Sequence, residues 1–325
     1  MELVCPAGTP AAFKAAVEAG ADSIYCGFAD ETNARNFPGL NFSRDELGES
    51  IKLAHSRGVK VLVALNTFPR AGDMGLWHSA VDDAFRLGAD AIILADIGLL
   101  DYARTKHPTA RLHLSVQAAA ANPESIGYSV ERFGVKRVVL PRVLTVDEIA
   151  TLNRDIACET EVFVFGGLCV MAEGRCSLSS YATGRSPNMN GVCSPASHVG
   201  YRQEGGELVS KLGEFTINRV SDDQPMPYPT LCKGKFCAGG VTGHLFEDPA
   251  SLDASALIPA LAEAGTTALK IEGRQRSRKY TDSVVRTFRA AVEAHARGEP
   301  IPTGALGALT EGQSSTSGAY QKTWR

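Results

Sequence analysis

The stretch Thr9-Pro-Ala-Ala-Phe-Lys-Ala-Ala-Val-Glu-Ala-Gly20-Ala-Asp-Ser-Ile-Tyr-Cys-Gly27 holds one complete structural unit of the chain. Thr9 can cap a helix, Pro10 suits the first helical position, and apolar residues then recur at helical spacing. Gly20 is suited to end that helix, because glycine readily adopts the left-handed backbone conformation of a helix C-terminus. The short β-rich run that follows predicts a strand directly after the helix.

The same order of helix, glycine and strand recurs around Gly58, Gly88, Gly134 and Gly265. Together with three further apolar runs, the pattern predicts eight strands, at residues 3–5, 23–27, 59–65, 91–94, 112–116, 137–140, 162–165 and 268–271. Short strands that alternate with helices are typical of a parallel (β/α)8 barrel. No glycine-rich dinucleotide motif follows the first strand, which disfavours the competing open, doubly wound sheet. We therefore expect an α/β fold, a TIM-like barrel.

The regular spacing is interrupted once, between the seventh and eighth predicted strands. Residues 166–266 form a connection far longer than is usual in βα units, and they hold five of the eight cysteines. Chain that follows the C-terminal end of a barrel strand lies at the active-site mouth. We expect one barrel domain over residues 1–302 that includes this insertion, followed by a tail at 303–325. The tail carries Tyr320 and Trp324, so we expect it to dock on the barrel or on a partner.

Composition restricts the classes of function. The 325 residues carry a net charge of −3, so no strong positive field recruits nucleic acid or an anionic membrane. No apolar run is long enough to span a bilayer, and the N-terminus lacks the features of an export signal. We expect a cytoplasmic protein. Disulfides are disfavoured there, and Cys5, Cys26 and Cys158 lie in or beside apolar stretches, where free cysteine behaves as a small hydrophobe.

The clustered cysteines indicate a metal centre. Cys169-x6-Cys176-x16-Cys193-x38-Cys232 provides the four thiolates that an iron–sulfur cluster requires. A structural zinc site would use the same ligand type, although it usually brings its ligands in close pairs. The spacing therefore leaves both metals open. Cys237 is expected to be a bystander, yet its closeness to Cys232 makes it a rival fourth ligand.

Charged and polar side chains fall at the ends of the predicted strands, where they would surround the same mouth. Lys270, Glu272 and Arg274 alternate along the last strand, so their side chains share one face. The Arg274 guanidinium suits a carboxylate ligand, or the three residues form an internal ion network that only fixes the barrel top. Asn66, Gln117 and Arg142 lie at or just past the ends of other strands, where they either line the same pocket or serve as structural hydrogen-bonding residues.

A resemblance adds to this reading of the residues. The run Glu161-Val-Phe-Val-Phe-Gly-Gly-Leu-Cys169-Val-Met-Ala-Glu-Gly-Arg-Cys176-Ser-Leu-Ser179 resembles the signature of the peptidase U32 family. Leu269-Lys-Ile-Glu-Gly-Arg274 and the opening Leu3-Val-Cys-Pro-Ala-Gly8 resemble further family motifs, so the similarity covers most of residues 1–298. Despite its name, the family consists chiefly of iron–sulfur proteins of anaerobic-type hydroxylation. The resemblance implies a 4Fe–4S cluster held by Cys169, Cys176, Cys193 and Cys232.

Two segments, residues 190–198 and 228–236, resemble the branch of the family that acts in ubiquinone biosynthesis. That branch implies an enzyme component that hydroxylates a ubiquinone-precursor ring without oxygen, with prephenate as the hydroxyl donor. It also implies a heterodimer with a UbiV-like subunit, and a UbiT-like lipid-binding accessory protein. Hydroxylation of RNA and peptidase activity are the alternatives. The near-neutral charge disfavours RNA, and no Ser–His–Asp order or zinc-protease motif supports a peptidase.

Two expectations concern the surroundings of the cysteines. Arg35-Asn-Phe37 resembles a loop element of the family and is expected to cover the pocket. Glu173 lies between Cys169 and Cys176, and we expect it to be a surface carboxylate.

Overall fold

The computed structural model describes residues 1–169, 171, 173–221, 223–224, 226–302, 304, 306–310 and 314–321. Eight parallel strands form a closed barrel, because the last strand, β14, pairs with both β1 and β7. The strands are β1 (Glu2–Pro6), β2 (Ser23–Cys26), β3 (Lys60–Leu65), β4 (Ala91–Leu94), β5 (Leu112–Leu114), β6 (Arg137–Val139), β7 (Glu159–Gly167) and β14 (Ala268–Ile271). Each coincides with one of the eight predicted runs. The TIM-like barrel is confirmed.

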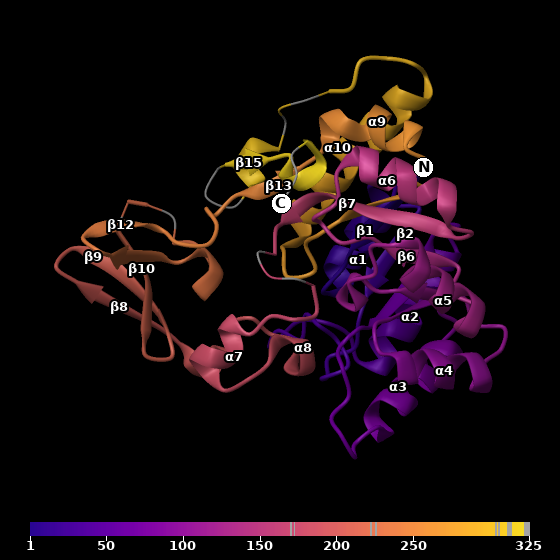
Figure 1. Ribbon diagram of the computed structural model, residues 1–325, viewed down its shortest axis with the longest axis horizontal. Coiled ribbons are helices and arrows are strands. Elements are labelled where there is room, and N and C mark those ends of the chain that lie inside the picture. The colour runs from indigo at the N-terminus through magenta and orange to yellow at the C-terminus, as the bar shows by residue number, and fades with distance from the viewer. Residues whose placement is uncertain are drawn as a thin grey trace.

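Helices surround the barrel on its outside (Figure 1). They are α1 (Pro10–Glu18), α2 (Arg44–His55), α3 (Gly75–Arg86), α4 (Ile97–Lys106), α5 (Pro123–Phe133), α6 (Val146–Asp155), α9 (Ile258–Glu263) and α10 (Arg278–Ala296). Helix α1 begins as its sequence predicts, since the Thr9 hydroxyl oxygen accepts a hydrogen bond from Ala12 N at 3.2 Å. Gly20, just beyond the helix end, has a φ of 96°. Among the described residues, no helix is both long and apolar enough to cross a membrane.

The main hydrophobic core lies between the barrel and these helices, and a smaller apolar group lies inside the barrel. The inner group consists of Val4, Tyr25, Leu62, Ala64, Ala91, Ile93 and Ala268. The Tyr25 hydroxyl donates to the Ile271 carbonyl at 2.9 Å, so this buried polar group is satisfied. The barrel interior is thus packed at mid-height, which leaves its two ends for polar groups.

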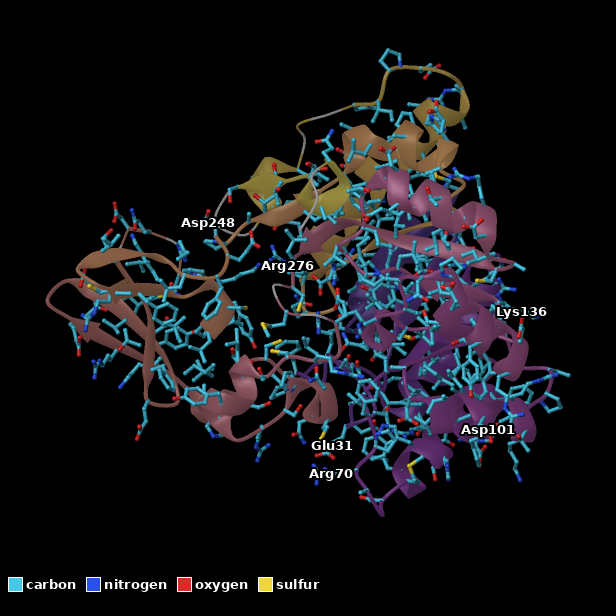
Figure 2. All side chains as sticks on the ribbon, in the orientation of Figure 1. Glu31, Arg70, Asp101, Lys136, Asp248 and Arg276 are labelled. Atoms are coloured by element: carbon cyan, nitrogen blue, oxygen red, sulfur yellow. The ribbon has the colours of Figure 1, made fainter. Side chains whose placement is uncertain are left out.

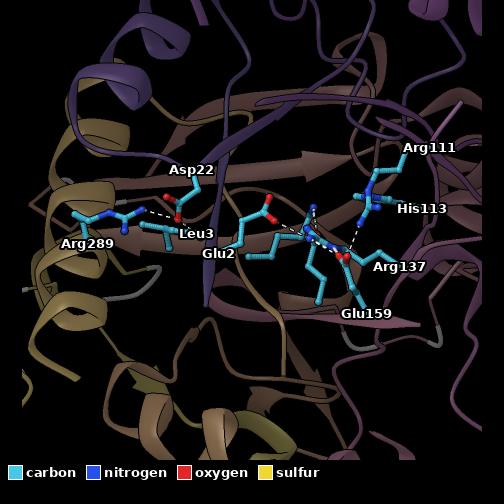
Figure 3. Close-up of polar contacts among 10 residues, drawn as sticks. Glu2, Leu3, Asp22, Arg111, His113, Arg137, Glu159 and Arg289 are labelled. Atoms are coloured by element: carbon cyan, nitrogen blue, oxygen red, sulfur yellow. Dashed lines mark hydrogen bonds and ion pairs between the residues drawn. The ribbon is translucent and has the colours of Figure 1, made fainter. Parts of the chain in front are cut away.

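Charged side chains close the N-terminal end of the barrel (Figure 3). The Arg137 guanidinium lies 2.6 Å from carboxylate oxygens of both Glu2 and Glu159, and 3.2 Å from Glu161. Glu161 is fully buried and also accepts a hydrogen bond from Lys270 Nζ at 2.5 Å. We call these five residues the base network. Each buried cation in it faces a carboxylate, which is the condition for burying charge without a large penalty.

Acid is expected to weaken the barrel through its base. Burial alone would raise the pKa of Glu2, but its hydrogen bond and attraction to Arg137 prevail and lower the pKa to about 2. Burial, together with Arg137 and Arg111, lowers the pKa of His113. In both cases the unfolded chain binds protons that the folded chain does not bind. The free energy of unfolding therefore decreases as the pH decreases. The loss due to His113 begins as the pH drops below about 6.5, and that due to Glu2 runs from about 4.5 towards 2.

Chemical denaturation at a series of pH values would measure this loss. The Glu2→Gln variant should be less stable at neutral pH and show a shallower decline below pH 4.5, since it no longer titrates at this position. A wild-type stability that stays constant from pH 7 to pH 3 would contradict the prediction.

The insertion after β7 forms a separate layer of structure beside the barrel mouth (Figure 1). It begins with the short helices α7 (Leu178–Thr183) and α8 (Pro187–Asn190). An antiparallel sheet of β8 (Val199–Glu204), β9 (Glu207–Leu212) and β10 (Phe215–Ser221) follows, and then a hairpin of β11 (Lys235–Ala238) and β12 (Val241–His244). Leu212, Ile217 and Leu231 form a small core of its own. The chain returns near Asp248, labelled in Figure 2, to β13 (Ser251–Asp253), which pairs with the end of β7.

The described part of the tail lies against the barrel. Strand β15 (Ser315–Thr316) pairs with β13, and the Tyr320 side chain is buried. The Tyr320 hydroxyl donates to the Phe163 carbonyl of β7 at 2.5 Å. The expected docking is confirmed for Tyr320, whereas Trp324 lies outside the described residues.

Candidate functional site

A cavity of about 130 Å³ lies between the barrel mouth and the insertion. We call it the outer cavity. Its lining includes all four predicted metal ligands, Cys169, Cys176, Cys193 and Cys232. Sulfur atoms gather between the barrel and the insertion in Figure 2. Cys237 instead lies on the exposed strand β11 and is not among the lining residues, so the structure separates it from the other four.

Four different local structures bring these cysteines together. Cys169 follows the end of β7, Cys176 precedes α7, Cys193 follows α8, and Cys232 lies in a single turn of 3₁₀ helix at Leu231–Lys233. The loop between the first two is seated on the barrel rim at Gly174, whose φ is 69°. A Cβ there would lie 2.1 Å from the Gln117 carbonyl oxygen, so only glycine permits this close approach.

Two thiols of this cavity, Cys193 and Cys232, are poor nucleophiles. Burial raises the pKa of Cys193 to about 11, although the nearby Arg35 guanidinium favours the thiolate. Burial also raises the pKa of Cys232. Thiol catalysis requires a thiolate near neutral pH, so these groups do not have the electrostatics of a cysteine peptidase. Among the described residues, no three His, Cys, Asp or Glu side chains converge tightly enough to hold a single metal ion.

A second, smaller cavity of about 40 Å³ lies inside the barrel. We call it the inner cavity. All six residues predicted from the strand ends line it: Asn66, Gln117, Arg142, Lys270, Glu272 and Arg274. Four side chains line both cavities, namely Arg35, Gln117, Arg142 and Glu272. The two cavities therefore adjoin each other across a layer of charged and polar side chains.

The three alternating side chains of the last strand make separate contacts. Lys270 belongs to the base network, and its ammonium lies 3.7 Å from the centroid of the Tyr25 ring. Glu272 lies 3.4 Å from Arg35 Nε, and Arg274 Nη1 donates to Asn33 Oδ1 at 2.6 Å. The closed Lys–Glu–Arg network that the sequence left as an alternative is not formed. Arg274 therefore has its guanidinium available for another purpose.

The inner cavity is lined by four cationic side chains, Arg35, Arg142, Lys270 and Arg274. The first three are ion-paired with Glu272, Glu173 and Glu161, which leaves Arg274 without a carboxylate partner among the described residues. Burial lowers the pKa of Arg274 to about 10, which shows that its charge is incompletely compensated. In the part of the chain that the structure describes, the hydrogen-bond partner of its guanidinium is the neutral amide of Asn33. Such a cavity suits an anion, because a carboxylate would pair with these buried guanidinium groups.

Two expectations about the surroundings have different outcomes. Arg35 and Phe37 line the outer cavity, so their loop lies at the site as expected. The expectation for Glu173 was wrong, because only 6% of its side chain is exposed and it is ion-paired with Arg142. The loop from Cys169 folds back onto the rim, so a carboxylate that local sequence places at the surface points into the mouth instead.

Two residues of the site were not identified from the sequence. Asn33 is fully buried and orients Arg274, and Phe163 lies beneath the Arg142 guanidinium at 3.6 Å from the ring centroid. Nothing in the sequence around either residue indicates that it belongs to the site. Asn33 occurs in an irregular loop, and Phe163 reads as an ordinary strand residue.

Comparison with known proteins identifies the family. A model of peptidase family U32 matches residues 8–315. The tRNA hydroxylation protein P of Escherichia coli is 31% identical over 327 aligned positions, which cover 95% of this chain and 71% of that protein. A 23S rRNA 5-hydroxycytidine synthase of Escherichia coli is 28% identical, over 90% of this chain and 39% of that protein. A collagenase of Porphyromonas gingivalis is 28% identical, over 91% and 66%. With its cysteine-lined barrel mouth and this match over nearly its whole length, the chain belongs to the peptidase U32 family.

Proposed function

We propose that this chain is the iron–sulfur component of an oxygen-independent ring hydroxylation in ubiquinone biosynthesis, similar to UbiU. In this proposal it works as a heterodimer with a UbiV-like subunit, with a UbiT-like accessory protein, and with prephenate as the hydroxyl donor. One observation carries the proposal. Four cysteines of a single insertion line a cavity at the barrel mouth, directly beside a cationic cavity inside the barrel.

Four cysteines that line one cavity have the ligand number of a 4Fe–4S cluster. Each cysteine of a 4Fe–4S cluster binds a different iron, so the four sulfurs surround the cluster without converging on one point. Zinc, which takes the same four thiolate ligands, is the alternative that metal analysis of the purified protein decides. Cys169, Cys176, Cys193 and Cys232 would hold the cluster, which would supply redox chemistry. The surrounding side chains would bind and orient the reactants and exclude water.

The inner cavity supports a carboxylate as hydroxyl donor. Arg274 and Arg35 offer guanidinium groups, and the ring of Tyr25 provides an apolar surface next to them. Prephenate combines carboxylates with an unsaturated ring that carries a hydroxyl group. One carboxylate would enter the inner cavity of about 40 Å³, and the rest of the molecule would extend into the adjoining outer cavity of about 130 Å³. The names of two relatives support hydroxylation as the class of reaction.

RNA is the second candidate substrate, because the same two relatives are named for the hydroxylation of tRNA and 23S rRNA. The net charge of −3 favours a small molecule, since surfaces that bind RNA are usually basic. Anaerobic assays with the co-expressed UbiV-like subunit, given either a phenolic ubiquinone precursor or unmodified tRNA, would distinguish the two. If tRNA is hydroxylated and the phenolic precursor is not, the substrate is RNA and the ubiquinone precursor is excluded.

Loss of one ligand is expected to remove the cluster. After anaerobic purification, the wild-type protein should be brown and contain about four irons and four sulfides per chain. Cys176→Ser should lose nearly all of both, because a three-thiolate site holds the cluster poorly. Iron and acid-labile sulfide assays with a visible spectrum make the measurement.

Cys237→Ser is the matched control, since Cys237 is exposed on β11 outside the outer cavity. It should retain the full cluster. A Cys237→Ser variant without a cluster would show that the ligand set is different. A wild-type protein that carries one zinc after preparation with ample iron and sulfide would refute the redox role.

A further inference from the structure

Arg142 is one of the four side chains shared by the outer and inner cavities. It lines both, and only 7% of the side chain is exposed. Its Nη1 is ion-paired with Glu173, which lies between Cys169 and Cys176. Its guanidinium stacks on Phe163 at 3.6 Å, which restricts the plane of the fork.

One N–H group of the Arg142 guanidinium has no hydrogen-bond acceptor among the described residues. Arg142 Nε is buried and has no hydrogen-bond partner among the described residues. A buried N–H of a charged group without a partner is costly, so such an atom in a native structure calls for an explanation. Because the side chain lines the inner cavity, a ligand there can supply the missing acceptor.

Several contacts of the described residues hold the loop that carries Cys169 and Cys176 against the barrel. One is the close approach of Gly174 to the Gln117 carbonyl, and another is the Glu173–Arg142 pair. The pair joins two almost fully buried side chains, so its loss would leave an uncompensated charge at the rim. The position of the loop therefore depends on Arg142.

We propose that Arg142 is a positioning residue that couples anion binding in the inner cavity to the order of the Cys169–Cys176 loop. Its guanidinium donates to Glu173 with one N–H group and to a carboxylate of prephenate with another, which its planar arrangement of N–H groups permits. Each contact orients the side chain for the other, so donor binding steadies the loop. The inference rests on the proposed function in one respect, the choice of prephenate as the anion.

The test uses cluster-free full-length protein under reducing conditions, in which the four thiols can be alkylated. Alkylation by iodoacetamide is followed at each cysteine by mass spectrometry, with and without prephenate. Exposed Cys237 is the internal reference. In the wild type, prephenate should slow alkylation of the half-buried Cys176 several-fold and leave Cys237 unchanged.

Two variants break the contact in different ways. Glu173→Asp keeps the charge but shortens the side chain, so any change reflects the contact and not the local charge. It should raise the ligand-free alkylation rate of the half-buried Cys176 by roughly tenfold with little change at the already exposed Cys169, and the protection by prephenate should be largely lost. Arg142→Gln should show the same acceleration and bind prephenate about tenfold or more weakly, as measured by calorimetry. The double variant should be no faster than Arg142→Gln alone, because both changes remove one contact.

The outcomes separate this inference from the proposed function. If prephenate binds the wild type but gives no protection, or if Glu173→Asp alkylates at the wild-type rate, Arg142 does not couple the cavities. If prephenate fails to bind the wild type, the proposed donor is wrong and the ligand half of the coupling fails with it. The ligand-free alkylation rates of the two variants then decide whether the Arg142–Glu173 contact orders the loop.

Discussion

Replacing Glu161 by alanine is expected to lower the free energy of unfolding by about 3–5 kcal/mol, the cost of leaving buried charges without their partner. Glu161 is fully buried and faces Arg137 at 3.2 Å and Lys270 at 2.5 Å. Burial already lowers the pKa of Lys270, and the Glu161 carboxylate is the main group that opposes this. Without it, the ammonium loses its compensation inside the barrel. Denaturant unfolding followed by circular dichroism measures the change.

Glu159→Ala is the matched control, because Glu159 lies on the same strand and contacts the same Arg137. Its carboxylate is 36% exposed, so its loss should cost about 1 kcal/mol or less. The pair Glu161→Leu with Lys270→Met removes both charges and should recover much of the stability. Equal effects of the Glu161 and Glu159 substitutions would contradict the role assigned to burial.

Most of the fold could be predicted from the sequence because short stretches of residues determine where each helix and strand begins and ends. Thr9 and Pro10 begin a helix, Gly20 ends it, and the run from Ser23 forms a strand because these preferences act over a few residues. Repetition of that unit then indicates the barrel, since eight βα units have few other ways to bury their apolar faces. The sheet and hairpin of the insertion have no such repeat, and the sequence predicted no structure for them.

The candidate site was predictable where position along the chain determines position in space. Residues at strand ends meet at the barrel mouth by topology alone, which is why all six expected side chains line the inner cavity. Contacts that depend on the path of a loop were not predictable. Glu173 turns inward only because its loop folds onto the rim, and Asn33 reaches Arg274 from 241 residues away in the sequence.

Arg274→Gln is expected to weaken prephenate binding about 100-fold, a loss of about 2.7 kcal/mol that corresponds to one or two charge-assisted hydrogen bonds. Three observations favour Arg274 over its neighbours as the principal contact. Its side chain is buried in the inner cavity, Asn33 fixes its orientation, and it has no carboxylate partner among the described residues. Arg35 and Arg142 each already face a glutamate, so part of their charge is committed.

Arg276→Gln provides the control, because Arg276 lies two residues further on and lines neither cavity. Its Nη2 donates to the Leu309 carbonyl at 3.1 Å, and Figure 2 labels its position. Calorimetry on both variants, with cluster content measured in parallel, should show a loss of affinity in Arg274→Gln alone and full clusters in both. A weakened affinity in both variants would point to a general electrostatic effect of lost charge. Unchanged affinity in Arg274→Gln would move the carboxylate site to Arg35 and Arg142, on the side of the inner cavity next to the cysteines.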